Sequence, residues 1–231
     1  MRRVLVTRAR EDAERTAEEL RRRGFAPLIA PVLEIVATGA ATPAETVDAV
    51  LATSARAIRY AGEGLTALRA PFFVVGAQTA QALAARGVQA QASAPDVAAL
   101  TALLQSRFAA PSRFLYLAGH DRKDDLESFL RARGHAATTV ETYEARAAQA
   151  LGGEAAAALA ADEIDAVLHF SARSASIFLA LAEGSTGARV VHCALSEEVA
   201  GVLRAAGCAD IRVAAAPDQA SLLAALEAVS R

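Results

Sequence analysis

The chain has 231 residues, of which 54% are hydrophobic, and a formal net charge of −2. This length suits one large domain or two small ones, and the apolar content is sufficient for a sizeable core. The near-neutral charge argues against a broad nucleic-acid-binding surface, so no nucleic-acid partner is expected. The N-terminus has no signal-peptide pattern and no window holds about 18 uninterrupted apolar residues, which predicts a cytoplasmic protein without a membrane partner.

Short apolar segments alternate with helical stretches along the chain. The clear strands are Val4–Thr7, Ala49–Thr53, Phe72–Val75, Phe114–Ala118, Ala166–Phe170, Arg189–Ala194 and Ile211–Ala215, and weaker candidates lie near Pro27–Ile35, Val88–Ser93 and Ala136–Tyr143. A helix over Glu11–Arg23 precedes Gly24, and others end at Gly87, Gly134 and Gly207, where glycine supplies a left-handed C-cap. Strands that are apolar on both faces and alternate with helices predict an α/β fold of parallel sheets flanked by helices.

One βα pattern occurs twice. Arg3–Ile35 aligns with Arg113–Ala145 at an offset of 110, and Asp48–Leu104 aligns with Asp165–Leu226. We name the first pattern X and the second Y, so the chain reads X, Y, X, Y. Either each lobe is a contiguous X–Y pair or the two lobes interleave.

Two stretches of small residues are typical of linkers, Thr38–Glu45 and Arg146–Glu154. Each follows a copy of X, which favours the interleaved arrangement. The expected domains are therefore a terminal lobe of residues 1–37 with 147–231 and an inserted middle lobe of residues 38–146.

Polar residues follow most of the predicted strands, at the sheet edge where parallel α/β proteins bind ligands. They are Thr7-Arg8, Thr53 to Arg56, Gly76 to Thr79, Gly119 to Lys123, Ser171 to Ser174, and Ser196. Helix N-termini, hydroxyls and a few cations suit an anionic ligand with several carboxylates or phosphates. The alternative is that each Ser or Thr only caps a helix, as these residues often do.

Other catalytic machinery is missing from the sequence. No phosphate-binding glycine loop, dinucleotide fingerprint, zinc-protease motif or nucleophile elbow occurs, and Cys193 and Cys208 are expected to be free thiols, so no metal and no cofactor is expected. His169 and His192 fall inside strands, where a buried, hydrogen-bonded imidazole is expected. His120 is the histidine best placed for a cleft, whereas His135 follows a helix end and is expected to be solvated.

Tyr143 stands at the end of the second X, beside the expected crossing between the lobes. Its position leaves two interpretations open, a buried structural tyrosine or a functional one.

Several segments together resemble the uroporphyrinogen-III synthase family. They are VLVTRARED, TSARAI, VVGAQTAQAL, YLAG with RKDDL and VETYEA, HFSARSASIF, and the closing P-D-x-x-S-L-L-x-A-L. The match is collinear over almost the whole chain, and its order and spacing carry the resemblance rather than any single motif. The resemblance implies two interleaved lobes joined by a two-strand connection, with the substrate held between them.

The resemblance also implies a cofactor-free cyclising hydro-lyase of tetrapyrrole (haem, sirohaem, cobalamin) biosynthesis. Hydroxymethylbilane loses its terminal hydroxyl as water, and the ring closes with ring D inverted to give uroporphyrinogen III. Tyr143, in the VETYEA segment, is then the candidate general acid. The substrate-binding candidates, from the strand ends and the family together, are Arg8, Thr53, Ser54, Arg56, Thr79, Gly119, Arg122, Lys123, Ser171 and Ser196.

The sequence departs from the family pattern in two places. Val199-Ala200 stands where the family has a Thr-Ala pair, and Thr7-Arg8-Ala9 stands where it often has Thr-Arg-Pro. The first departure weakens any role for that helix terminus in binding substrate.

Two rival functions remain at this point. A non-catalytic two-lobed binding or sensor protein for an anionic small molecule explains the polar strand ends equally well, but it does not require Tyr143. A nucleotide-using transferase is disfavoured by the missing glycine loop. The expected partner is a small-molecule polycarboxylate, the linear tetrapyrrole. Transient handover of this substrate from hydroxymethylbilane synthase is also expected, and the protein itself is expected to be a monomer.

Overall fold

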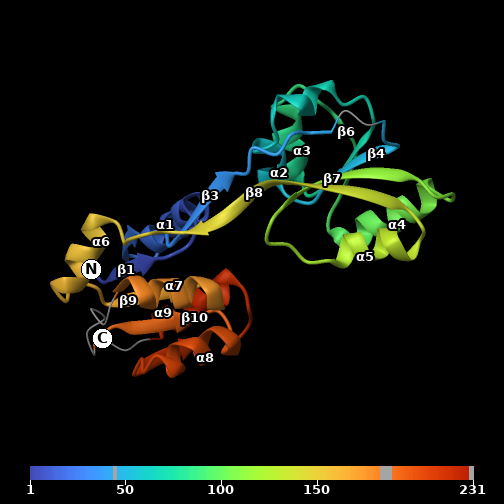
Figure 1. Cartoon of the computed structure of the whole chain (residues 1–231). Helices are drawn as coiled ribbons and strands as arrows, with labels where there is room; N and C mark the ends of the chain where they lie inside the picture. Colours follow the sequence, from blue (N-terminus) through green and yellow to red (C-terminus); the bar gives the residue numbers. More distant parts are fainter. Residues whose placement is uncertain (44–45, 183–188, 229–231) are drawn as a thin grey trace. The chain divides into compact units, whose positions relative to one another are not determined.

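The computed structural model describes residues 1–43, 46–182 and 189–228, and it has the α/β fold expected from the sequence (Figure 1). The strands are β1 (Arg3–Val6), β2 (Ala26–Ile29), β3 (Leu33–Ala37), β4 (Ala49–Ala52), β5 (Phe72–Val75), β6 (Ala90–Ala94), β7 (Arg113–Gly119), β8 (Ala136–Ala147), β9 (Ala166–His169), β10 (Val191–Ala194) and β11 (Asp210–Val213). The helices are α1 (Arg10–Arg22), α2 (Ala55–Arg59), α3 (Ala77–Ala84), α4 (Val97–Arg107), α5 (Asp125–Ala132), α6 (Gly153–Ala160), α7 (Ala172–Ala182), α8 (Glu197–Ala205) and α9 (Gln219–Glu227), with a 3-10 turn η1 (Glu63–Ala67).

The described strands form two sheets with equivalent orders. One sheet has five strands in the order β11-β10-β9-β1-β2, and the other has six in the order β3-β8-β7-β4-β5-β6. The pairs within β11 to β2 and within β8 to β6 are parallel. Without β3, the strands β2-β1-β9-β10-β11 correspond in order to β8-β7-β4-β5-β6. Each sheet therefore holds one X and one Y, and the interleaved fold class is confirmed.

The chain divides into two compact units, a terminal unit of Met1–Glu34 with Arg146–Arg231 and a middle unit of Ile35–Ala145. The unit boundaries fall at β3 and β8, which are neighbours in their sheet (Figure 1). The domain boundaries expected from the sequence, after residues 37 and 146, stay a prediction.

The pairing of β3 with β8 runs in the opposite sense from the rest of the sheet. The N–H of Thr38 donates to the carbonyl of Thr142 at 3.1 Å, and the N–H of Ala148 donates to that of Val32 at 3.0 Å. Residue numbers therefore rise along β3 as they fall along β8, which is the antiparallel sense.

Both sheets are covered on both faces, which is why their strands are apolar without alternation. In the terminal unit, Val4 and Val6 pack in one buried cluster with Leu20 of α1, whereas Leu5 packs on the other face with Phe178 of α7. The middle sheet repeats the pattern, with Val50 and Leu51 in clusters on opposite faces.

The expected helix ends are confirmed. Gly24, Gly87, Gly134 and Gly207 have φ of +80°, +76°, +73° and +80°. This left-handed conformation is one that residues with a side chain adopt reluctantly.

Other expectations need correction. The candidate strand near Pro27–Ile35 is two strands, β2 and β3, interrupted at Pro31, which has no N–H to donate to a sheet. The expected linker Arg146–Glu154 is shorter than predicted: β8 extends to Ala147 and α6 begins at Gly153, so only residues 148–152 form neither helix nor strand. In the expected linker Thr38–Glu45, residues 38–43 form neither helix nor strand, and residues 44–45 lie outside the described residues.

Cys193 and Cys208 are free, as expected. No helix in the described ranges has the length and apolar character needed to cross a membrane.

Candidate functional site

A cavity of about 270 Å³ lies in the middle unit, at the carboxyl ends of β4 and β7 and the start of α5. Six of the residues predicted from the sequence line it: Thr53, Ser54, Gly119, Arg122, Lys123 and Tyr143. The remaining lining residues are Val97, Tyr116, Asp121, Asp125 and Leu126. This is the edge of a parallel sheet where ligands bind in α/β proteins.

Tyr143 is half-buried and is held on several sides. Its hydroxyl donates to Oγ of Ser54 at 3.4 Å, and its ring centroid lies 6.0 Å from that of Tyr60. A Cβ added to Gly119 would lie only 2.5 Å from Cζ of Tyr143, so the ring lies against the backbone of Gly119. The phenol is thereby held at the cavity wall.

A β-bulge next to Tyr143 sets the direction of its side chain. Ala118 pairs with Glu141 and Gly119 pairs with Tyr143, which leaves Thr142 as the extra residue of β8. The hydroxyl of Thr142 donates to the carbonyl of Ala57 at 3.0 Å and to that of Ala118 at 3.3 Å. Bulges beside functional sites commonly re-aim a side chain in this way. Thr142 was not predicted from the sequence, because an extra residue in a strand leaves no local pattern.

The hydroxyls that follow β4 have partners within the protein. Oγ1 of Thr53 lies 2.8 Å from the hydroxyl oxygen of Tyr116, and Oγ of Ser54 accepts the N–H of Arg56 at 3.2 Å. Burial raises the pKa of Tyr116. Ser54 therefore caps α2, as the alternative interpretation expects, and it also faces Tyr143. Tyr116 was missed because it lies within a strand that reads as wholly apolar.

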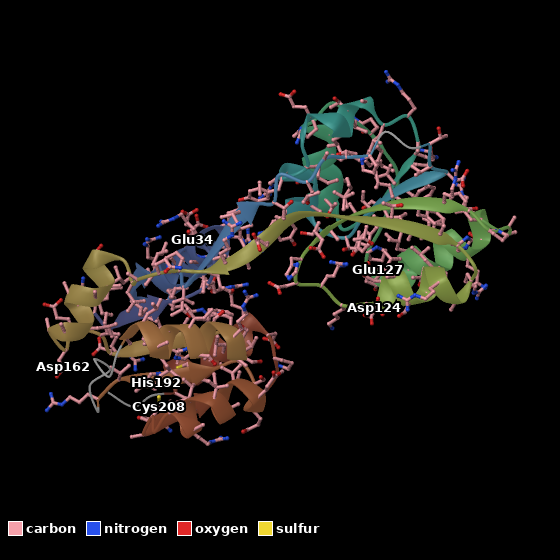
Figure 2. All side chains as sticks on the ribbon, in the orientation of Figure 1. Glu34, Asp124, Glu127, Asp162, His192 and Cys208 are labelled. Carbon is pink, nitrogen blue, oxygen red and sulfur yellow. The ribbon has the colours of Figure 1, made fainter. Side chains whose placement is uncertain are left out.

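Arg122 is the centre of an ionic network that joins the loop after β7 to α5 and β8. Nε and one terminal nitrogen of Arg122 donate to the two carboxylate oxygens of Glu127 at 2.9 and 3.0 Å. The other terminal nitrogen donates to Glu141 at 2.7 Å and to the carbonyls of Gly119 at 3.0 Å and His120 at 3.3 Å. Figure 2 shows Glu127 on α5, with Asp124 at the start of that helix.

The charges of this network shift one another's titration. Hydrogen bonding to Arg122 lowers the pKa of Glu127, and Glu127 in turn raises the pKa of Arg122. The pKa of Glu141 is lowered first by its hydrogen bond with Nδ1 of His120, 2.8 Å away, and then by Arg122. The same contact raises the pKa of His120. All four groups are therefore favoured in their charged forms.

The remaining charges at the cavity are mixed. Within the described part of the chain, the side chain of Lys123 forms no ion pair, in contrast to that of Arg122. Asp121 and Asp125 add two carboxylates to the cavity wall. The cavity thus combines the few cations expected from the sequence with carboxylates.

A model of the family described as uroporphyrinogen-III synthase HemD matches residues 14–224. The chain belongs to the uroporphyrinogen-III synthase family. It is therefore a lyase-type enzyme of tetrapyrrole biosynthesis, as the motifs implied. No sequence in a set of curated proteins matches the chain.

Solved structures of similar fold carry the same family name. The match to the uroporphyrinogen-III synthetase of Helicobacter pylori covers 100% of both chains, with a TM-score of 0.62 and 16% identity. A mutant uroporphyrinogen III synthase from Thermus thermophilus covers 98% of both chains with a TM-score of 0.51 and 22% identity. At these identities the likeness concerns the fold, and it matches the two-lobed α/β architecture.

Five of the predicted substrate-binding residues are not among the residues that line the cavity: Arg8, Arg56, Thr79, Ser171 and Ser196. Thr79 is buried in α3 and Arg56 lies in the first turn of α2. In the terminal unit, Oγ of Ser171 accepts the N–H of Ser174 at 3.1 Å, and Oγ of Ser196 accepts the N–H of Val199 at 3.4 Å. Both serines thus bond to the first turn of a helix, and their binding roles stay predictions.

Arg8 and Val199 both lie in the terminal unit, the first as a predicted substrate-binding residue and the second as a departure from the family pattern. The Arg8 guanidinium donates to Oε1 of Gln219 at 3.0 Å and lies 4.2 Å over the ring of Phe170. Val199, which replaces the family's threonine, is buried in α8 against Leu203. At that helix start the family hydroxyl is replaced by a core contact.

His169 and His192 are buried as expected, whereas His120 is largely exposed and is not among the residues that line the cavity. Nε2 of His169 lies 3.0 Å from Nδ1 of His192, and both rings are buried. His135 was expected to be solvated but is buried, because its Nδ1 accepts the N–H of Ser112 at 3.1 Å and its ring packs on Phe114. Across the described residues, no group of three or more His, Cys, Asp or Glu side chains is placed to hold a metal ion.

Proposed function

We propose that this protein cyclises hydroxymethylbilane to uroporphyrinogen III, a cofactor-free hydro-lyase reaction, in the cytoplasm. The match of the family model over residues 14–224 carries the proposal. The cavity supports it, because Tyr143 gives this wall an acidic hydroxyl that a binding or sensor protein would not need. No observation favours the non-catalytic alternative.

The reaction removes one water from the substrate. The bond between the terminal methylene carbon and its hydroxyl breaks, the hydroxyl takes a proton and leaves as water, and the pyrrole nitrogen supplies electrons to the cation that remains. The substituted carbon of ring D then attacks this methylene carbon first and forms a spiro intermediate. Rearrangement of that intermediate inverts ring D, and a final proton is lost. Reactant and product therefore differ by H2O alone.

We assign the proton donor to Tyr143. Its hydrogen bond to Ser54 is long at 3.4 Å, so the proton is only weakly engaged by the protein and is available to a substrate hydroxyl. General acid catalysis of this kind contributes a factor of about 10²–10⁴.

The remaining groups of the cavity suit different parts of the substrate. Lys123 and the free N–H groups at the start of α5 suit carboxylates. Asp121 and Asp125 instead suit the pyrrole N–H groups and the cation that forms when hydroxide leaves. We further propose carboxylate contacts from Thr53, Ser54, Arg56, Thr79, Gly119, Arg8, Ser171 and Ser196.

Orientation of the bilane is the larger task. Without an enzyme the reactive bilane closes to the isomer in which ring D is not inverted, so the protein must favour one attacking carbon over another. Holding reacting groups in the productive geometry contributes roughly 7–11 kcal/mol in favourable cases. We expect a monomer to perform this task, with the substrate supplied by transient handover from hydroxymethylbilane synthase.

The identity of the isomer tests the proposal. The protein is coupled to the production of hydroxymethylbilane from porphobilinogen, and the products are oxidised and separated. We expect the type III isomer at catalytic protein concentrations. Accumulation of the type I isomer alone would show that the protein is not a synthase.

A further inference from the structure

We propose that Arg122 is a positioning residue for Tyr143 rather than a ligand for substrate, and that Lys123 is the cation that binds a substrate carboxylate at this cavity. The inference rests on the proposed function. Arg122 and Lys123 are neighbours in the chain, and both were predicted from the sequence to bind substrate.

The hydrogen bonds of Arg122 leave little capacity for a substrate. An arginine has five N–H donors, and within the described residues the three nitrogens of Arg122 make five hydrogen bonds: to the two oxygens of Glu127, to one oxygen of Glu141, and to the carbonyls of Gly119 and His120. Glu127 and Glu141 already share the positive charge of Arg122. A third carboxylate, from the substrate, would have to compete with both of them.

The same contacts connect Arg122 to the catalytic side chain. Arg122 holds the carbonyl of Gly119, the residue against which the ring of Tyr143 lies. It also holds the carbonyl of His120, whose N–H donates to the carbonyl of Tyr143 at 2.9 Å. Glu141, two residues before Tyr143 on β8, anchors the guanidinium from the other side. A displaced Arg122 would therefore loosen the turn that supports the phenol.

Lys123 differs from Arg122 in its contacts, although both residues line the cavity. In the part of the chain that the structure describes, the ammonium of Lys123 has no carboxylate partner. An ammonium that is still hydrated and unpaired binds an incoming carboxylate without first breaking an ion pair.

Steady-state kinetics of type III formation separate the two roles. Arg122→Lys keeps the charge but loses the planar fork that holds Glu127 and the carbonyls together. We expect it to lower kcat by about tenfold or more with KM within about twofold, since small displacements of reacting groups are costly. Lys123→Gln is expected to raise KM, with a smaller effect on kcat. A raised KM with unchanged kcat for Arg122→Lys would overturn the proposal.

Glu141→Gln gives a second test, because the two interpretations of Arg122 predict changes in different kinetic parameters. If Arg122 positions Tyr143, losing this anchor lowers kcat. If Arg122 binds substrate, removing a competing carboxylate lowers KM instead, and the proposal fails. Glu141 is the more exposed of the two carboxylates and the Glu127 pair remains, so this variant is expected to fold even if Arg122→Lys does not.

A measurement without substrate distinguishes failure of this inference from failure of the proposed function. The chain has three tyrosines, so fluorotyrosine labelling gives three ¹⁹F resonances, and Tyr143→Phe identifies one of them. We expect Arg122→Lys and Glu141→Gln to shift or broaden the Tyr143 resonance. Arg204→Lys, which alters an exposed pair with Glu197 at 2.9 Å, is the matched control and is expected to leave it in place. An unmoved Tyr143 resonance in the first two variants would contradict the positioning role.

Discussion

The ring of Tyr143 lies against the backbone of Gly119, with no room between them for a side chain. A Cβ on Gly119 would lie 2.5 Å from Cζ and 2.7 Å from the hydroxyl oxygen of Tyr143, closer than the 3.0 Å that real Cβ atoms keep from other heavy atoms. The position of the Tyr143 ring on β8 therefore requires a glycine at residue 119, the end of β7. The two residues were predicted from the sequence as site residues for separate reasons, and in the structure they are in direct contact.

Replacing Gly119 by alanine should displace the phenol. Because the clash is with the rigid end of an aromatic ring, we expect Gly119→Ala to lower kcat for type III formation by about tenfold to a hundredfold. It should also cost about 1–3 kcal/mol of unfolding free energy, as overpacking usually does. Kinetics and urea unfolding measure the two effects. Gly62→Ala, in the same unit with open space around its Cβ, is the control. Full activity in Gly119→Ala would mean that the ring position does not matter.

Removing the hydroxyl of Tyr143 should affect rate far more than stability. The 3.4 Å bond to Ser54 is long, so Tyr143→Phe should change the free energy of unfolding by no more than about 1 kcal/mol. The type III rate should fall by about 10²–10⁴-fold if this phenol is the general acid. Tyr60→Phe, which keeps its ring against Tyr143 and loses a 3.3 Å bond to the carbonyl of Ile35, should stay within about twofold of the parent rate. An unchanged rate in Tyr143→Phe removes it from the mechanism.

The duplicated pattern made most of the fold predictable from the sequence. Each X begins at an arginine whose N–H donates to the aspartate that begins a Y: Arg3 to Asp165 at 2.6 Å, and Arg113 to Asp48 at 2.7 Å. The strands, helices and caps around these residues follow from local patterns. Local patterns do not decide which X shares a sheet with which Y, because both possible pairings would join an arginine to an aspartate. That choice follows from long-range packing, which the sequence alone left open.

The site was predictable at the strand ends and unpredictable in its contacts. Thr53 and Gly119 were identified because they follow apolar strands, and Tyr143 because it stands at the end of the second X, in the VETYEA segment of the family resemblance. The partners of Arg122 were not, because Glu141 lies 19 residues away on another element. The extra residue in β8 at Thr142 has no signature in the sequence. His135 was misassigned because its burial depends on the loop around Ser112.

The buried pair of His169 and His192 makes the stability of the terminal unit depend on pH in the acid range. Their rings stack at 5.2 Å between centroids, and Nδ1 of His169 has no hydrogen-bond partner in the described structure. Burial lowers the pKa of His169 to about 3 and that of His192 to about 4, although Asp210 acts in the opposite direction on His192. Both imidazoles are therefore neutral in the folded protein at neutral pH.

Acid should therefore unfold the terminal unit through these histidines. Both pKa values are lower in the folded state than the unfolded value of about 6.5, so the unfolded chain binds more protons as the pH falls below 6.5. Stability from the pair is complete above that pH. It is lost toward pH 4, with a slope approaching about 1.4 kcal/mol per pH unit for each imidazole. Amide exchange of β9 and β10 measures this loss, while the tyrosines, all between residues 60 and 143, report the middle unit. His192→Gln, which keeps a hydrogen-bonding group but does not titrate, should roughly halve the slope. A terminal unit equally stable at pH 7 and pH 4.5 would contradict the assignment of neutral, buried imidazoles.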